Sequence, residues 1–394
     1  MRGCLETAIG EAKSSAIILD FSAVERAYPN GMVPLIVLVE QVRTTCGTDF
    51  SLILPDNVGC RRAMCDNNWA AHLAPGANHQ LSRQGINALH RFTDDAMLNE
   101  LVNTQIHQAL GQATYAEGVL QSFEWALNEI AGNVLIHSGG ESGWVQVVVQ
   151  PATKHLEIVV CDGGVGIPVG IRGAFPEAGM TRDEDAIAHA LKEGITSRPD
   201  FGQGKGLTGT LEIVKANVGG RLSIHSGGGL VEWIDAKLVI RPSSPSFQGT
   251  MVDVQLRIDQ PIDIERALWG SAPAYPFNES LFGKDMPVGL MRLELAREAS
   301  GFGNRITGQK VRTKIENLLA AAPSDVLEID FADVGMMASS FADEVFGKLA
   351  STLGFVGFSS RLRLKGLNRF CQGIIDDVVQ SRIVQSRNGR DHVK

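Results

Sequence analysis

The sequence lacks the features that mark zinc-binding, membrane-spanning and general nucleic-acid-binding proteins. Its six cysteines are scattered, and no two have the two-residue spacing of a zinc knuckle or a redox motif. The longest apolar run, residues 32–39, is far too short to cross a membrane, and residues 1–15 contain no apolar signal segment. The net charge of -8 gives no overall attraction for phosphate backbones. We therefore expect a cytoplasmic protein with free thiols, no membrane contact and no nucleic acid as its default partner.

The composition is that of a folded globular protein. Hydrophobic residues make up 44% of the 394 residues and charged residues 20%, which argues against long disorder. Domains average about 150 residues, so the length predicts two or three of them. We expect three domains, at residues 1–105, 106–258 and 286–394, with a linker at 259–285 that is rich in proline and small residues.

The first and last parts of the chain share one strand-and-helix pattern. Residues 16–21 (AIILDF) and 326–331 (VLEIDF) are short apolar runs typical of buried strands. The two copies align without gaps as D-F-x-x-V, starting at Asp20 and at Asp330. An internal duplication of a small α/β unit is the preferred interpretation. The expected helices lie at 32–44 and 341–353, and a further strand at 50–54.

The middle of the chain has a different pattern, a long helix followed by several strands. Residues 114–136 place Phe123, Leu127, Ile130 and Val134 on one face of the expected helix. Strands are expected at 144–149, 156–161, 221–225, 230–240 and 251–258.

On that helix, Asn128, Glu129 and Asn133 form N-E-x-x-x-N, away from the apolar face. The i,i+4 spacing puts Glu129 and Asn133 on one side. A carboxylate beside a carboxamide suits a site that positions a magnesium ion and a water at a nucleotide phosphate, because Mg²⁺ prefers hard oxygen ligands. The alternative is an ordinary solvated helix face.

Two glycine-rich segments follow the helix. After the strand at 156–161, D-G-G-V-G-I-P begins at Asp162, whose carboxylate can meet an adenine amino group; a tight turn is the alternative. Residues 201–207 (FGQGKGL) place alternating glycines before a helix, where backbone N–H groups can wrap phosphate oxygens and Lys205 adds a cation. On the last strand, Thr250 provides a hydroxyl near the nucleotide.

In this order, N-E-I-A-G-N, D-G-G-V-G, G-Q-G-K-G-L and G-T resemble the N, G1, G2 and G3 boxes of the GHKL ATPases, the group of gyrase, histidine kinases, mismatch-repair MutL and anti-sigma serine kinases. The resemblance implies a Bergerat-type domain that binds ATP and Mg²⁺. It implies that Glu129 is the general base, that Asn133 is the magnesium ligand and that Asp162 binds adenine. The other implied nucleotide-binding residues are Gly164, Gly166, Thr196, Gly202, Gly204, Lys205, Gly206, Leu207 and Thr250.

The resemblance also assigns residues 167–201, including Thr196 and Ser197, to a lid over the nucleotide. His137 follows the N box as in anti-sigma and related soluble members, and a structural role at the helix end is preferred over catalysis. No helical H-E/D-x-R/K stretch precedes the ATPase region, so autophosphorylation of the sensor-kinase type is disfavoured. The glutamate of the N box favours hydrolysis or phosphorylation of a hydroxyl group.

The two outer units resemble STAS domains, the fold of anti-anti-sigma factors. Ser339, with Ser340 beside it, falls where those proteins carry a phosphorylated serine. Phe341 and Ala342 stand in place of the usual Gly-Leu, and a helix N-cap is the alternative explanation of the serine pair. The N-terminal copy has Pro29 at this place, so a docking or dimer contact is expected of it.

Together these patterns predict an α/β (α+β sandwich) fold, a central Bergerat-type ATP-binding domain flanked by two small STAS-like α/β domains. The predicted function is an ATP-binding regulatory protein, an ATPase switch whose nucleotide state controls the STAS-like interactions. The alternatives are a protein-serine kinase of the anti-sigma type and an ATP-gated dimeric clamp on a macromolecular partner. We expect a protein partner or a homodimer through the STAS-like units, and a solvated helix or tail for the basic residues after position 360.

Overall fold

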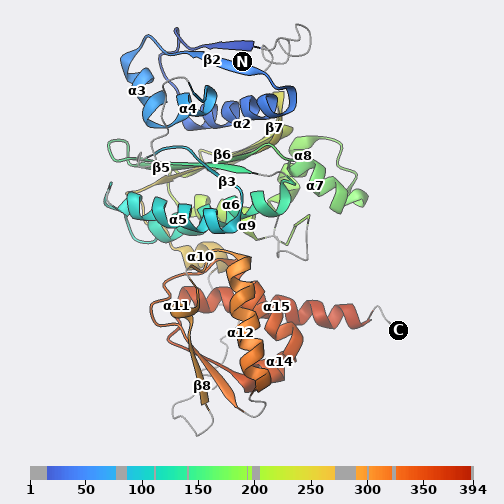
Figure 1. Ribbon diagram of the computed structural model, residues 1–394. Coiled ribbons are helices and arrows are strands. Elements are labelled where there is room, and N and C mark those ends of the chain that lie inside the picture. Colours follow the sequence, from blue (N-terminus) through green and yellow to red (C-terminus); the bar gives the residue numbers. More distant parts are fainter. Residues whose placement is uncertain are drawn as a thin grey trace.

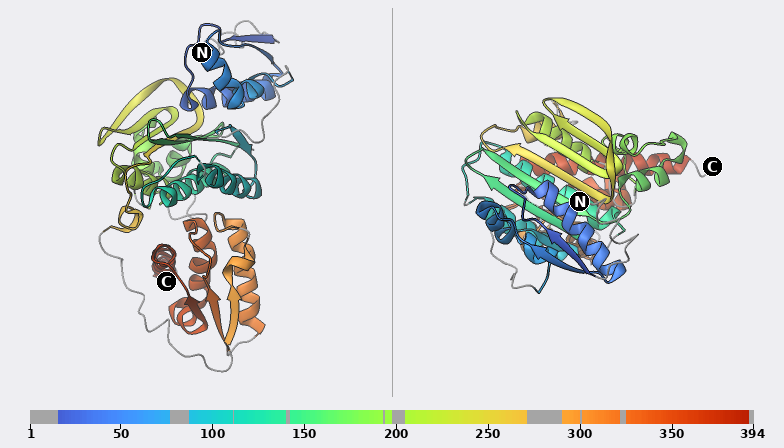
Figure 2. Two further views of the ribbon diagram at one scale, coloured as in Figure 1. Left: turned by 90° about the vertical axis from the view of Figure 1, so that its left-hand side faces the viewer. Right: turned by 90° about the horizontal axis from the view of Figure 1, so that it is seen from above.

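The computed structural model contains three units, each with its own sheet (Figure 1). It describes residues 16–76, 87–110, 112–139, 142–192, 194–197, 205–270, 290–299, 301–321 and 325–391. The units follow one another in a row, with the central one between the other two (Figures 1 and 2). Within these residues, no helix has the length and apolar character needed to span a membrane. The predicted mixed α/β fold class is confirmed.

The central unit is a five-stranded antiparallel sheet in the order β3-β4-β5-β7-β6. Its strands are β3 (His90–Phe92), β4 (Gly143–Gln150), β5 (His155–Asp162), β6 (Arg221–Ile234) and β7 (Lys237–Arg257). A layer of helices covers one face (Figure 1), namely α5 (Asp95–Leu110), α6 (Val119–His137) and α9 (Gly206–Ala216). Strands β4 and β5 are buried along almost their whole length, because protein covers both faces of the sheet.

The N-terminal unit covers the other face of this sheet. It pairs two parallel strands and adds three helices: β1 (Ala16–Asp20), β2 (Asp49–Ile53), α2 (Pro29–Cys46), α3 (Val58–Asp66) and α4 (Trp69–Leu73). Its apolar side chains form one cluster with Trp144, Val159 and Met251 of the central sheet. A buried hydrogen bond of 2.9 Å from Trp69 Nε1 to Gln146 Oε1 crosses the same interface. The central sheet is therefore the middle layer of a sandwich.

The C-terminal unit is a three-stranded parallel sheet, β10-β9-β8, with helices packed on it. Its elements are β8 (Leu290–Glu294), α11 (Leu295–Glu298), α12 (Arg305–Ala321), β9 (Val326–Asp330), α13 (Ser339–Ala342), the π-helical turn η3 (Asp343–Gly347), α14 (Lys348–Arg361), β10 (Leu362–Lys365) and α15 (Arg369–Asp391). Its buried side chains, including Phe341 and Phe346, belong to the same apolar cluster as Phe123 of the central unit. The two units are thus packed together over a shared core.

Both outer units make the same turn after one of their strands, β1 in the N-terminal unit and β9 in the C-terminal unit. Asp20 Oδ1 accepts the backbone N–H of Ser22 at 2.9 Å, and Asp330 Oδ1 accepts that of Ala332 at 2.9 Å. An aspartate that binds the N–H two residues ahead stabilises such a turn. In each unit this strand also pairs in parallel with the strand that follows it in the chain. The repeated sequence therefore corresponds to a repeated local structure.

Three expected elements differ from the structure. The helix expected at 114–136 begins only at Val119, because Gly118 before it takes a φ of +78°. The strand expected at 230–240 is the tip of the β6–β7 hairpin, because Asp235 and Ala236 adopt φ of 50° and 57° and reverse the chain. The first part of the expected linker forms α10 (Ile264–Trp269), which packs on α9 and α15, and residues 271–285 lie outside the described residues.

Candidate functional site

A cavity of about 150 Å³ lies where α6, the end of β5 and the start of α9 meet the C-terminal unit. Two further helices form part of its wall, α7 (Ile167–Ala174) and α8 (Asp183–Ala190). The structure gathers most of the residues that the sequence assigned to a nucleotide site, since Glu129, Asn133, Asp162, Gly166, Thr196, Lys205, Gly206, Leu207 and Thr250 line the cavity. Gly202 and Gly204 lie outside the described residues.

Helix α6 brings Glu129 and Asn133 to the cavity. Its apolar face, with Phe123 and Leu127, is buried in the core. Glu129 and Asn133 lie beside that face on the helix and line the cavity. A Cβ atom on Gly206 would lie 2.7 Å from Glu129 Oε2 and 3.5 Å from Asn133 Nδ2. The side chains of Glu129 and Asn133 therefore lie close to the backbone at the start of α9. The expected base and magnesium ligand stand beside a helix N-terminus, which favours phosphate oxygens.

Asp162 is the last residue of β5 and stands opposite Thr250 of β7. Its Oδ1 accepts the backbone N–H of Gly164 at 2.8 Å. Burial raises the pKa of Asp162 to about 6, although backbone hydrogen bonds from Gly164 and Thr250 lower it. At neutral pH the group is mainly ionised, and a carboxylate with little surrounding water is a strong acceptor for an amino group.

The turn after Asp162 needs glycine because it passes close to other backbone. A Cβ atom on Gly164 would lie 2.1 Å from the carbonyl oxygen of Ser138. Gly166 adopts a φ of +78°, and a Cβ atom there would lie 2.8 Å from Ser226 Oγ. Gly164 is not among the residues that line the described cavity, so its contribution is to let the turn pack against the end of α6.

The segment expected to form a lid contacts the end of α6. Ser197 Oγ and His137 Nδ1 share a hydrogen bond of 2.9 Å, and both residues line the cavity with Thr196. His137 is the last residue of α6, and its ring joins the segment after α8 to the cavity wall, which is a structural contact at the helix end. Residues 198–204 of the expected lid and glycine loop lie outside the described residues.

The C-terminal unit closes one side of the cavity. Ser339 Oγ donates a hydrogen bond to Glu129 Oε1, across a sequence separation of 210 residues. Lys205 Nζ lies 2.5 Å from Asp377 Oδ1 of α15, and the two side chains are 29% and 22% exposed. Two central-unit residues expected to act on the nucleotide are thus both held by the C-terminal unit. Arg305 also lines the cavity.

The expectation that Ser339 caps a helix is wrong. The N-cap of α13 is Ala338, and Ser339 is the first helical residue, whose hydroxyl binds Glu129. Burial raises the pKa of Glu129, whereas the Ser339 hydrogen bonds and the positive charge of Arg305 lower it. A carboxylate in direct contact with a hydroxyl, and with a raised pKa, is suited to accept that hydroxyl's proton.

Sequence reasoning did not find Arg305 or Asp377. Neither belongs to a motif, because Arg305 reaches the cavity and Asp377 reaches Lys205 only where the C-terminal unit packs on the central one. The one signal for this docking was the alignment that placed Ser339 at a STAS phosphoacceptor position.

Comparisons with known proteins agree with two of the three expected domains. Residues 118–260 match the family described as "Histidine kinase-, DNA gyrase B-, and HSP90-like ATPase". Residues 307–369 match a "STAS-like domain of unknown function (DUF4325)". Among solved structures, the mycobacterial sensor histidine kinase MprB is similar, with 18% identity and a TM-score of 0.24 over 43% of this chain and 98% of that one. A search of curated proteins gave no significant match.

Proposed function

We propose an ATP-dependent regulatory role for this chain, because residues 118–260 belong to the histidine kinase-, DNA gyrase B- and HSP90-like ATPases and residues 307–369 form a STAS-like domain. In this proposal, ATP in the cavity controls how the STAS-like domain docks on it. The observation that carries the proposal is the hydrogen bond from Ser339 to Glu129, since it places the docked domain on the expected catalytic carboxylate.

The residues around the cavity suit Mg²⁺-ATP. Asp162 presents a carboxylate to an adenine amino group, and the N-terminus of α9 at Gly206 presents backbone N–H groups to phosphate oxygens. Asn133 offers a hard oxygen ligand to Mg²⁺, which takes most of its other ligands from phosphate and water. Bound in this way, ATP supplies a phosphoryl group next to Glu129.

Docking responds to ATP because nucleotide and STAS-like domain compete for one cation. Lys205 is the lysine of the glycine loop, and Asp377 already holds it at 2.5 Å. A phosphate oxygen that takes Lys205 leaves Asp377 without this partner and places like charges close together. A ligand shifts a conformational equilibrium only by its different affinities for the two states, and this competition supplies such a difference.

The second candidate is phosphorylation of Ser339 within the same chain. Ser339 Oγ would attack the γ-phosphorus of ATP, the bond from that phosphorus to the β–γ bridging oxygen would break, and ADP would leave. The hydroxyl proton would pass to Glu129, which already accepts it in a hydrogen bond. Phosphoserine beside Glu129 would repel that carboxylate, so the product would also loosen the docked domain.

Hydrogen exchange of the full chain, followed by mass spectrometry, tests the switch. Mg²⁺-ATP is expected to increase exchange in α13 and α15 relative to the nucleotide-free protein, because the Lys205–Asp377 contact is lost. The variant Asp162→Asn, which removes the expected adenine contact, should show no such increase. Identical hydrogen exchange in wild type with and without bound ATP would refute the proposal.

The same samples separate the kinase from the other candidates. Transfer predicts one phosphate on Ser339, absent from Ser339→Ala and retained in the matched control Ser340→Ala. ATP turnover without protein-bound phosphate would favour the ATPase switch. Dimerisation that requires ATP, measured by light scattering, would favour the clamp instead.

A further inference from the structure

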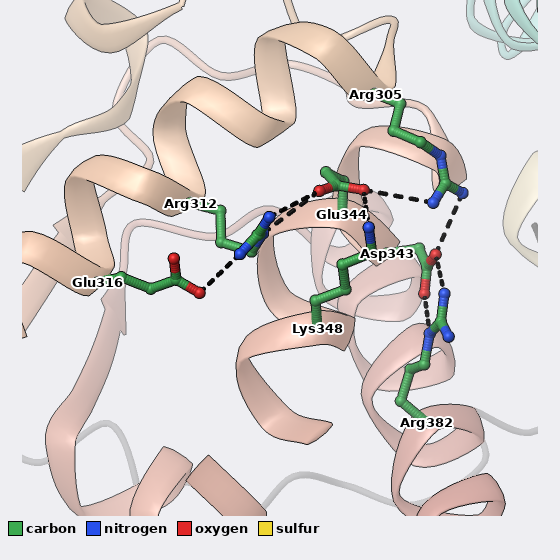
Figure 3. A network of polar contacts seen from close by, with 7 residues as sticks. All are labelled: Arg305, Arg312, Glu316, Asp343, Glu344, Lys348 and Arg382. Carbon is green, nitrogen blue, oxygen red and sulfur yellow. Dashed lines mark hydrogen bonds and ion pairs between the residues drawn. The ribbon is translucent and has the colours of Figure 1, made fainter. Parts of the chain in front are cut away.

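A network of ion pairs surrounds two buried carboxylates, Asp343 and Glu344, which follow Ser339 by four and five residues (Figure 3). Asp343 and Glu344, the first two residues of η3, are each only 2% exposed. Asp343 accepts a forked contact from Arg382, with both N···O distances at 2.7 Å. Glu344 pairs with Lys348 at 2.6 Å and with Arg312 at 3.2 Å. Each buried carboxylate is thus paired before Arg305 is considered, as burial of a charge requires.

Arg382 was expected to belong to a solvated C-terminal end. Its side chain is instead 17% exposed and forms the forked contact with Asp343. That expectation is therefore wrong for this residue, which fixes α15 to η3.

Arg305 is the cation that the network can release. It contacts Asp343 at 3.2 Å and Glu344 at 3.3 Å, one nitrogen to each. Both distances exceed those of Arg382 and Lys348 and are close to that of Arg312, which does not line the cavity. The four cations of Figure 3 face three carboxylates, so one positive charge is in excess. If Arg305 leaves, three cations remain for three carboxylates.

Of these four cations, Arg305 is the one that lines the nucleotide cavity. It is the first residue of α12, and its side chain is 15% exposed. Its charge acts on Glu129, which lies next to the N-terminus of α9 at Gly206. Arg305 therefore stands at the end of the cavity where the phosphates are expected.

We propose that Arg305 is a phosphate-binding residue that the STAS-like domain contributes to the nucleotide site, and that it binds the terminal phosphate of ATP. This inference rests on the proposed function of the cavity. The planar guanidinium matches the spacing of two phosphate oxygens, which a lysine in the same place would not. On binding, the N–H groups of Arg305 transfer from Asp343 and Glu344 to the phosphate.

Through this transfer, the ion pairs inside the STAS-like domain depend on whether the nucleotide carries a third phosphate. ADP has no group at that place, so with ADP Arg305 stays on Asp343 and Glu344. With ATP, both carboxylates lose their contact to Arg305, while η3 keeps its ion pairs to α12 through Arg312, to α14 through Lys348 and to α15 through Arg382. A π-helical turn is a frequent element of functional sites, and here it carries both carboxylates.

The test compares Mg²⁺-ATP and Mg²⁺-ADP affinities of the full chain by calorimetry. Arg305→Ala is expected to lower the affinity for ATP by roughly ten- to a hundredfold, the effect of losing a charge-assisted contact. The affinity for ADP should change by less than about twofold. Arg305→Lys keeps the charge and loses the forked geometry, so its ATP affinity should lie between those of Arg305→Ala and wild type. It replaces Arg305→Ala in the test if that variant does not fold.

Arg312→Ala is the matched control, because Arg312 also binds Glu344 but does not line the cavity. It should leave the ratio of ATP to ADP affinities unchanged. A second measurement is hydrogen exchange in η3, which ATP and not ADP should alter in wild type, and which ATP should no longer alter in Arg305→Ala.

The two proposals fail in different ways. Wild-type protein that binds neither nucleotide would overturn both. If wild type binds ATP and ATP changes exchange in α15, but Arg305→Ala and Arg305→Lys lower ATP and ADP affinities equally or not at all, the proposed function stands and the role of Arg305 is overturned.

Discussion

Replacing Asp377 with asparagine should tighten ATP binding. In the structure Asp377 holds Lys205 at 2.5 Å, and the proposed function requires ATP to take this lysine for its phosphates. Asparagine has nearly the size of aspartate but carries no charge. Asp377→Asn therefore weakens the competitor for Lys205 and also removes an anion from beside the phosphate site.

The size of the effect follows from the exposure of the pair. The Lys205 and Asp377 side chains are 29% and 22% exposed, so the pair is neither a surface pair nor a fully buried one. Surface pairs contribute about 0.2–1 kcal/mol and charged hydrogen bonds about 1.5–3 kcal/mol, so about 1 kcal/mol is a reasonable value here. Since about 1.4 kcal/mol corresponds to tenfold in affinity, ATP should bind about fivefold more tightly.

Calorimetric titration with Mg²⁺-ATP measures this gain. Asp377→Glu keeps the charge and is the matched control, expected to bind within about twofold of wild type. The gain in Asp377→Asn should shrink at high salt, because ions screen partly exposed charges. If Asp377→Asn binds ATP no more tightly than Asp377→Glu, the competition for Lys205 does not exist and the docking argument loses its basis.

Two further predictions concern the adenine end of the cavity and the shared core. ATP affinity should fall as pH drops through about 6, because burial raises the pKa of Asp162 to about 6 and the protonated carboxyl no longer accepts as a carboxylate; calorimetry in wild type and Asp162→Asn checks this, and a pH-independent affinity in wild type would contradict it. Phe341→Ala should lower the free energy of unfolding by about 3–5 kcal/mol, because Phe341 is fully buried and packs edge-on against Phe302 at 5.5 Å. Denaturant unfolding measures the loss, and Val356→Ala, at a side chain 78% exposed, should change stability by less than about 0.5 kcal/mol.

Much of the central unit could be predicted because its signals are local. The spacing of Phe123, Leu127 and Ile130 fixes which face of α6 is buried, and this leaves Glu129 and Asn133 for the cavity. The hairpin tip was missed for an equally local reason. Asp-Ala is a weak turn signal, since alanine seldom adopts the positive φ that Ala236 has here.

The contacts between units could not be predicted in this way. Ser339 before a helix is locally an N-cap, and only the docked Glu129 gives its hydroxyl another acceptor. Likewise, nothing in the spacing of Lys205 indicates a carboxylate 172 residues further along the chain. The local sequence around Ser339 and Lys205 fits several contacts equally well, and only the packing of the units selects the one that forms.

The N-terminal unit also contacts the central unit beside the cavity. Gln41 Nε2 of α2 donates to the carbonyl oxygen of Gly163 at 2.6 Å, and a Cβ atom on Gly163 would lie 2.3 Å from that nitrogen. Gly163 directly follows Asp162, so the N-terminal unit touches the main chain where the adenine is proposed to bind, while Ser339 touches the far end. Under the proposed function, the outer units therefore meet the site at its two ends, the N-terminal unit behind the adenine position and the C-terminal unit at the phosphates.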